Sequence, residues 1–336
     1  MVLAFNVHGV RLRATVDTAS LAQRLRGILG PFEAETAEAD FLLDVRHEAG
    51  PFPDVTPDGM EEHWRGTLPD GPPAVCFRGP SERETLLPGL ARMRLAERGA
   101  DVHVAPGADW CLNLGCLLPA LCEFLARRGH YVVHAGTLSW DAAGGRRALL
   151  LCGPSGFGKT TTALALAHAG MQLLTDDATF LVAQPPGGTR VPPVESALRV
   201  WGLPRPCKVH RRTVALMPWL RPHCDGQRPV GDEYLVELAA LAGSGALAMA
   251  EPALVLFLEE RNPLAHRLRP LDKVQAVARL ANENVRAADL RGQGPAGDAF
   301  RALADMARRT PTCTLSVGPD LESLHESLLP LLASPR

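Results

Sequence analysis

The sequence predicts an α/β protein with two parts, a smaller N-terminal α+β domain (residues 1–108) and a larger α/β domain (residues 109–336). Two observations lead to this prediction. In the larger domain, an apolar strand-like run enters a glycine-rich loop that continues directly into a helix-like run, the order that is typical of open α/β sheets. In the smaller domain, short strand-like runs accompany a helical run, and no catalytic pattern is found.

The size and composition of the chain limit the classes of protein it can belong to. A length of 336 residues suits two domains, and an apolar content of 46% is enough for a core in each. The formal net charge of −2 gives no reason to expect a nucleic-acid partner. Residues 112–126 are the most apolar stretch but are shorter than the ~20 residues of a membrane span, and residues 1–7 do not resemble a signal peptide. We therefore expect a cytoplasmic protein without membrane contact.

Elements of the smaller domain follow from periodicity and from residues that end or cap elements. Alternation of apolar and polar residues predicts strands at 5–12, 41–45 and 74–77. A helix is predicted from Ser20, a capping residue type, to Leu29. The Pro-, Gly- and Asp-rich residues 50–59 predict a loop, which makes the nearby carboxylates a solvated surface and not a metal site.

In the larger domain, a hairpin is predicted immediately before the glycine-rich loop. Strands at 131–138 and 147–152 are separated by a turn at 141–145. A helix over 110–128 precedes them and ends in Arg127-Arg128-Gly129. The remaining predictions are strands at 171–175, 253–258 and 314–317, helices at 271–290, 297–309 and 321–332, and loops at 185–193 and 204–229.

The glycine-rich loop fits the phosphate-loop pattern G-x-x-x-x-G-K-[ST] at every position. Glycines let consecutive N–H groups turn toward phosphate oxygens, and the following helix N-terminus adds partial positive charge. Lys159 is predicted to reach the β- and γ-phosphates, and the Thr160 hydroxyl is predicted to bind Mg²⁺. The competing interpretation is a chance glycine-rich turn. The predicted cofactor-binding residues are Gly153, Pro154, Ser155, Gly156, Phe157, Gly158, Lys159, Thr160 and Thr161.

Two adjacent carboxylates, Asp176 and Asp177, end the strand predicted after the loop helix. Ligands of open α/β sheets lie at the carboxyl ends of strands, so both are predicted to face the phosphates. Phosphoryl transfer needs one carboxylate to hold Mg²⁺ and one to accept the proton of the attacking hydroxyl. Neighbours in a regular strand point to opposite faces, but a turning chain lets both converge. In the alternative, Asp176 is catalytic and Asp177 only caps a turn.

Weaker candidates lie on either side of this motif. His134, on the predicted hairpin, either contacts a phosphate or the aspartates, or is a structural histidine. Lys208 is one of only three lysines, and Arg205 lies close to it in a segment where a substrate could bind. Both are predicted to contact substrate, and Arg205 could also neutralise charge in a transition state. For each cation the alternative is an exposed side chain without a function.

Three segments together resemble the kinase domain of HPr kinase/phosphorylase and its relatives. They are His134-Ala135-Gly136, the loop at 153–160, and Gly170-Met171-Gln172-Leu173-Leu174-Thr175-Asp176-Asp177. The family combines a His-Gly element, G-x-S-G-x-G-K-[ST] and G-x-x-L-x-x-D-D in this order. The resemblance implies a P-loop fold related to phosphoenolpyruvate carboxykinase, ATP and Mg²⁺ as cofactors, and phosphorylation of a serine hydroxyl. By this analogy Asp176 is the base, Thr160 and Asp177 bind the metal, and His134 tunes the base or contacts phosphate.

Departures from the family pattern bear on the acceptor. Thr161 stands where HPr kinases carry Glu, and their E-I-R-G-L-G element is only echoed by residues 197–203. We therefore expect the acceptor serine in a small protein or ribosomal precursor peptide other than HPr. The relatives are often hexamers, which implies a homo-oligomer.

Other function classes stay open at this point. A kinase for free serine or a sugar-like hydroxyl has the same motifs, and a nucleotide sensor without catalysis would share the loop. An ABC-type transport ATPase requires an L-S-G-G-Q element and a strand that ends in Asp-Glu, and neither is found in the sequence.

Overall fold

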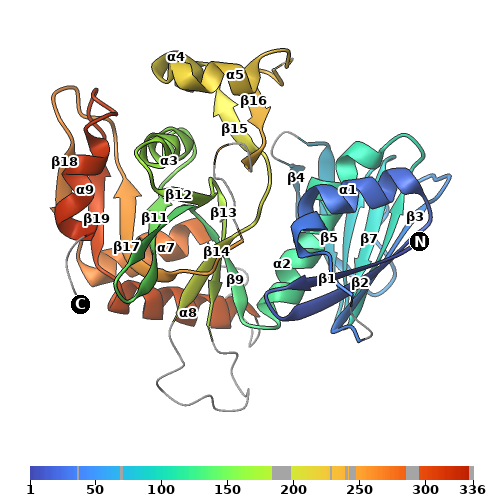
Figure 1. Ribbon diagram of the computed structural model, residues 1–336. Helices are drawn as coiled ribbons and strands as arrows, with labels where there is room; N and C mark the ends of the chain where they lie inside the picture. Colours follow the sequence, from blue (N-terminus) through green and yellow to red (C-terminus); the bar gives the residue numbers. More distant parts are fainter. Residues whose placement is uncertain are drawn as a thin grey trace. The chain divides into compact units, whose positions relative to one another are not determined.

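The computed structural model is an α/β protein with several separate sheets (Figure 1). It describes residues 1–35, 38–68, 71–183, 198–227, 229–238, 241, 247–284 and 295–332. The chain divides into two compact units, Met1–Arg128 and Gly129–Arg336. This corrects the boundary predicted after residue 108. Residues 109–128 belong to the first unit because their helix buries Phe124, which stacks on Phe41 of the N-terminal sheet with ring centroids 4.5 Å apart.

The first unit contains an eight-stranded sheet. Its order is β1 (Val2–Val7), β2 (Val10–Val16), β3 (Phe41–His47), β8 (Gly99–Val104), β7 (Ala91–Leu95), β6 (Arg83–Leu87), β5 (Pro73–Arg78) and β4 (Glu61–Thr67). A hairpin of β1 and β2 replaces the single strand predicted over 5–12. His8 and Gly9 have positive φ of 50° and 92°, so the chain turns there.

Two helices of the first unit pack on the same part of this sheet. They are α1 (Ala19–Leu29) and α2 (Leu118–Ala126), and α2 follows a π-helical segment at Leu112–Leu117. The N-cap of α1 is Thr18, whose hydroxyl accepts the N–H of Leu21, and not the predicted Ser20. Leu29 of α1 and Leu121 of α2 line the same apolar gap as Phe5 of β1. The helix predicted over 110–128 is thus part of the N-terminal core.

The second unit is built on a six-stranded mixed sheet. Its order is β12 (Gln172–Thr175), β10 (Gly136–Ala142), β11 (Gly145–Cys152), β17 (Glu251–Leu258), β19 (Thr312–Ser316) and β18 (Arg267–Pro270). The predicted hairpin is confirmed, since β10 pairs with β11 in antiparallel register. β10 is also antiparallel to β12, so β11 and β12 run in the same direction and end at the same edge of the sheet.

Helices cover both faces of this sheet (Figure 1). The alternation of side chains along β17 shows the two layers: Leu256 joins a core that includes residues of α3 (Lys159–His168) and α9 (Leu324–Leu332). Phe257 points the other way and lies under the guanidinium of Arg279, 5.8 Å from its ring centroid. Arg279 belongs to α7 (Lys273–Asn284), which packs on α8 (Pro295–Arg309).

The described part of the second unit also contains two small sheets. They are formed by β14 (Arg199–Gly202), β13 (Ala178–Val182) and β9 (His130–His134), and by β15 (Cys207–His210) and β16 (Glu233–Val236). The single strand predicted over 131–138 is divided at Ala135, because β9 pairs with β13 while β10 joins the large sheet.

The loop predicted over 204–229 is wrong. This segment contains β15, α4 (Arg211–Leu216) and α5 (Arg221–Cys224), because Val209 and Leu220 are fully buried and anchor it in the core. The loop predicted over 185–193 and the last part of the helix predicted over 271–290 lie outside the described residues. In the described part of the chain, no helix has the length and apolar character needed to cross a membrane.

Candidate functional site

The phosphate-loop motif connects the end of β11 to the start of α3. Gly153, Gly156 and Gly158 have φ of 143°, 85° and 88°, values that residues with a side chain rarely adopt. Gly158 is the N-cap of α3, and no side-chain cap bonds the described helix start. The first N–H groups of a helix without such a cap are free to bind an anion. The local geometry is therefore that of an anion-binding loop.

Lys159 is buried, and its ammonium group lies within this loop. Its Nζ atom donates to the carbonyl oxygen of Gly153 at 2.6 Å and to that of Pro154 at 3.3 Å. Thr160 follows on the first turn of α3, and its hydroxyl faces Asp176. Thr161 does not: its hydroxyl lies 2.8 Å from that of Thr213 on α4. The structure thus brings Lys159 and Thr160 into the site and directs Thr161 away from it.

Asp176 follows β12 at the edge of the sheet where β11 also ends. The Thr160 hydroxyl donates to its Oδ2 atom at 3.5 Å, and the side chain is buried. Burial raises the pKa of Asp176 to about 6, the positive charge of Arg205 opposes this rise, and the negative charge of Asp177 adds to it. The backbone N–H of Lys208 also bonds this carboxylate. Asp176 therefore titrates close to neutral pH.

Asp177 has the opposite electrostatic character. Its Oδ1 atom lies 2.8 Å from Nε2 of His134, and its Oδ2 atom forms an ion pair with the guanidinium of Arg205. Burial favours the neutral carboxyl group, but the hydrogen bond from His134 and the charge of Arg205 outweigh it and lower the pKa of Asp177 to about 2. Neighbouring carboxylates whose pKa values are driven apart are a frequent feature of acid–base sites.

The backbone explains how two sequence neighbours serve one site. The chain leaves the large sheet after β12 and enters the small sheet at β13, so Asp176 and Asp177 lie at the turn between them. The Thr175 hydroxyl accepts the N–H of Ala178 at 3.2 Å and fixes this turn. Gly136 packs beside it: a Cβ atom there would lie 3.0 Å from the carbonyl oxygen of Asp176. Both aspartates are thereby held against the hairpin that precedes the loop.

Arg205 and Lys208, the two predicted substrate contacts, both lie beside the aspartates. Arg205 is directed at Asp177, with 20% of its side chain exposed, and its Nε atom is buried without a hydrogen-bond partner. Lys208 lies on β15, where its backbone meets Asp176. The thiol of Cys207, the preceding residue, also hydrogen-bonds Asp176. β15 is thus part of the wall of the site.

Two residues of the site were missed by the sequence analysis. Glu283 accepts the N–H of Gly153 at 3.1 Å, and Asn284 accepts the N–H of His134 at 2.6 Å. They lie 130 and 150 positions from their partners in the chain. No local pattern in the sequence marks them.

The residues that could hold a metal are few. Among the described residues, no group of three or more His, Cys, Asp and Glu is arranged around one point. Mg²⁺ at a nucleotide site takes one or two carboxylates and completes its shell with phosphate oxygens and water. Thr160 and Asp176, in contact with one another, have the hard oxygen donors that this ion prefers.

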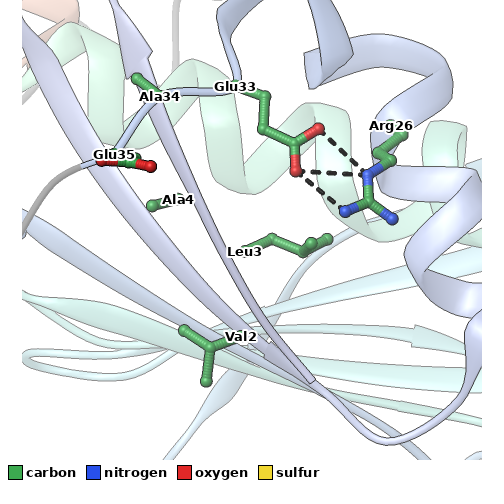
Figure 2. A pocket seen from close by; sticks show the side chains of 7 residues that line it. All are labelled: Val2, Leu3, Ala4, Arg26, Glu33, Ala34 and Glu35. Atoms are coloured by element: carbon green, nitrogen blue, oxygen red, sulfur yellow. Dashed lines mark hydrogen bonds and ion pairs between the residues drawn. The ribbon is translucent and has the colours of Figure 1, made fainter.

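A separate hollow lies in the first unit of the chain. It has a volume of about 680 Å³ and lies beside the edge strand β1 (Figure 2). Arg26 and Glu33 pair there through hydrogen bonds of 2.9 to 3.3 Å, so their charges neutralise each other. Its lining has no nucleophile and no unpaired basic group: Val2, Leu3, Ala4, Arg26, Glu33, Ala34 and Glu35. The phosphate-loop segment therefore stays the candidate functional site.

No protein-family model matches the chain, and no curated protein is significantly similar to it in sequence.

Proposed function

We propose that the protein is an ATP-dependent kinase that phosphorylates a serine hydroxyl of a small protein or peptide. The observation that carries this proposal is the contact between the phosphate-loop residue Thr160 and the carboxylate of Asp176, 3.5 Å apart. The hairpin of β10 and β11 before the loop adds support for a P-loop kinase domain of the HPr kinase and phosphoenolpyruvate carboxykinase type.

The residues of the loop fit a triphosphate with its magnesium ion. The N–H groups at the start of α3 and the ammonium of Lys159 would bind phosphate oxygens, and the Thr160 hydroxyl would bind the metal. An added Cβ atom at Gly156 or Gly158 would meet nothing within 4 Å, so the φ values, and not crowding, require glycine there. When bound, Mg·ATP supplies the transferable phosphoryl group and part of the charge neutralisation.

Asp176 is the base in this proposal. Its pKa of about 6 leaves it ionised at neutral pH yet basic enough to take a proton. As the serine oxygen forms its bond to phosphorus and the bond to the ADP oxygen breaks, Asp176 accepts the hydroxyl proton. Asp177 stays ionised, since His134 and Arg205 stabilise its charge. In this version it is the carboxylate that would hold the magnesium ion.

The contact of Asp176 with Thr160 also favours a second division of roles. In that version Asp176 shares the metal with Thr160, and Asp177, oriented by His134, receives the proton. A metal ion beside Asp176 would lower its pKa, because the nearby positive charge favours the carboxylate. The two versions predict different pH profiles of kcat.

A direct test is transfer of labelled phosphate. The purified protein is incubated with Mg²⁺, γ-labelled ATP and either serine-containing peptides or free serine. We expect label on a peptide serine with the wild type and none with Asp176→Asn. Asp141→Asn is the matched control, since 80% of the Asp141 side chain is exposed at the turn of the hairpin. Label on free serine alone would move the assignment to a small-molecule kinase, and ATP hydrolysis at the same rate without an acceptor would contradict the kinase.

A further inference from the structure

The C-terminal end of α7 carries two adjacent polar side chains, Glu283 and Asn284, that reach different parts of the site. Glu283 bonds the phosphate loop, and Asn284 bonds the strand that carries His134. α7 itself is firmly held: Leu280 is buried, and Arg279 pairs with Glu259 at 3.3 Å. The two side chains therefore project from a fixed support.

Glu283 bonds Gly153, the first residue of the loop. Its Oε2 atom accepts the N–H of Gly153 at 3.1 Å, while the carbonyl of the same glycine accepts the ammonium of Lys159 at 2.6 Å. Burial raises the pKa of the neighbouring Cys152 thiol; the negative charge of Glu283 adds to the rise and the positive charge of Lys159 opposes it. All of these groups thus lie close together. The N–H of Gly153 is therefore bonded by Glu283, and its carbonyl oxygen is bonded by Lys159.

Asn284 acts on the side of the site that holds Asp177. Its Oδ1 atom accepts the N–H of His134 at 2.6 Å, and its Nδ2 atom donates to the carbonyl of Leu280 at 2.8 Å. The second bond fixes which end of the amide faces His134, because only the nitrogen can donate. The ring of His134 then reaches Asp177 at 2.8 Å. Asn284 therefore fixes the position of the end of β9, which carries His134.

We propose that Glu283 and Asn284 are positioning residues that hold the two halves of the site separately. Glu283 places the phosphate loop and Lys159, and Asn284 places His134 and, through it, Asp177. The effect on catalysis rests on the proposed kinase function, whereas the placement of the two segments does not.

The two residues should therefore affect different kinetic quantities: Glu283 the Kd for Mg·ATP, and Asn284 kcat. Glu283→Ala is expected to raise the Kd for Mg·ATP about tenfold with a smaller change in kcat, because a hydrogen bond to a charged group is lost at the loop. Glu283→Gln keeps an acceptor oxygen and is expected to restore most of the affinity. Asn284→Ala is expected to lower kcat about tenfold and to leave this Kd within twofold. Asn282→Ala is the control, since this exposed asparagine lies on the same turn of α7.

Amide hydrogen exchange followed by NMR tests the placement directly and needs no activity. Glu283→Ala should speed exchange at the Gly153 N–H and not at that of His134, and Asn284→Ala should do the reverse. Unchanged exchange at both amides, or equal acceleration at both in either variant, would overturn the proposal. A wild type that binds no ATP would overturn the kinase function instead, and the exchange rates would still decide the roles of Glu283 and Asn284.

Discussion

Nε2 of His134 lies 2.8 Å from Oδ1 of Asp177. His134 ends β9, and Asp177 immediately precedes β13, which pairs with β9 so that Ala178 stands opposite His134. The contact therefore follows from the register of the small sheet and does not depend on a flexible loop. The same strand register brings a histidine that precedes the phosphate loop in the chain to a carboxylate that follows it.

Replacing His134 with alanine should affect catalysis more than nucleotide binding. The hydrogen bond that lowers the pKa of Asp177 is lost, while Lys159 and the loop keep their contacts. We expect kcat to fall at least tenfold and the Kd for Mg·ATP to stay within about twofold. Steady-state kinetics and calorimetric titration measure the two quantities. An equal loss in both would show that His134 supports nucleotide binding, by contact with the phosphates or through Asp177 at the metal.

Asp176→Asn should stabilise the fold while it removes activity. The pKa of Asp176 is raised from 3.8 to about 6, so between these pH values the folded chain keeps a proton that the unfolded chain has released. The free energy of unfolding therefore falls as the pH rises through this window, by ~3 kcal/mol in total. The neutral amide avoids this loss, and we expect the Tm at pH 7.5 to rise by about 5 °C.

Phosphoryl transfer by the same variant should be about 10³-fold slower. Scanning calorimetry and the labelling assay measure the two effects on one preparation. Asp141→Asn, at an exposed position, should change neither. A lower Tm in Asp176→Asn would contradict the assignment of an unfavourable buried charge to this carboxylate.

The pH dependence of kcat distinguishes the two divisions of roles. If Asp176 is the base, kcat at saturating Mg·ATP rises with pH through about 6 and then levels, because only the carboxylate accepts the proton. If Asp177 is the base, its pKa of about 2 places the change far below the working range, and kcat is flat between about pH 5 and 8. A flat profile would favour the version in which Asp177 is the base.

Arg205→Ala should change stability in acid. The folded-state pKa of Asp177, about 2, lies below its ordinary value of 3.8. The hydrogen bond from His134 and the ion pair with Arg205 therefore stabilise the fold above about pH 4, and this contribution is lost as the pH falls toward 2. Without Arg205 the pKa of Asp177 rises. The free energy of unfolding should then decline less as the pH falls from about 4 to 2. Urea midpoints measured from pH 2 to 7 test this. Arg308→Ala, with 68% of the arginine side chain exposed, is the control and should keep the wild-type slope.

Gly136→Ala should lower kcat without weakening nucleotide binding. The added Cβ atom would lie 3.0 Å from the carbonyl oxygen of Asp176, a contact that forces this part of the backbone to move. We expect about a tenfold loss of kcat, since small misplacements of catalytic groups are costly. Gly144→Ala, in the turn of the same hairpin, has its nearest neighbour at 3.9 Å and should behave like the wild type. Equal activities of the two variants would refute the close approach at Gly136.

Features fixed by neighbouring residues could be predicted from the sequence. The hairpin before the loop and the strand–loop–helix order follow from turn residues and from glycines that need positive φ, which are local properties. The helix at 110–128 was predicted as well, but its apolar residues could not show which sheet they cover. Similarly, residues 204–229 have a loop-like composition, and only the burial of Val209 and Leu220 makes them part of the core.

For the site, the sequence by itself determined the phosphate loop and the pair of aspartates, because both are short patterns whose geometry is set by adjacent residues. The tertiary structure decided the partners. It separated the pKa values of Asp176 and Asp177 through burial and through His134 and Arg205. It also brought Glu283 to Gly153 across 130 positions of chain. Such contacts arise when distant strands and helices pack together, and packing of this kind leaves no periodic or local signal in the order of the residues.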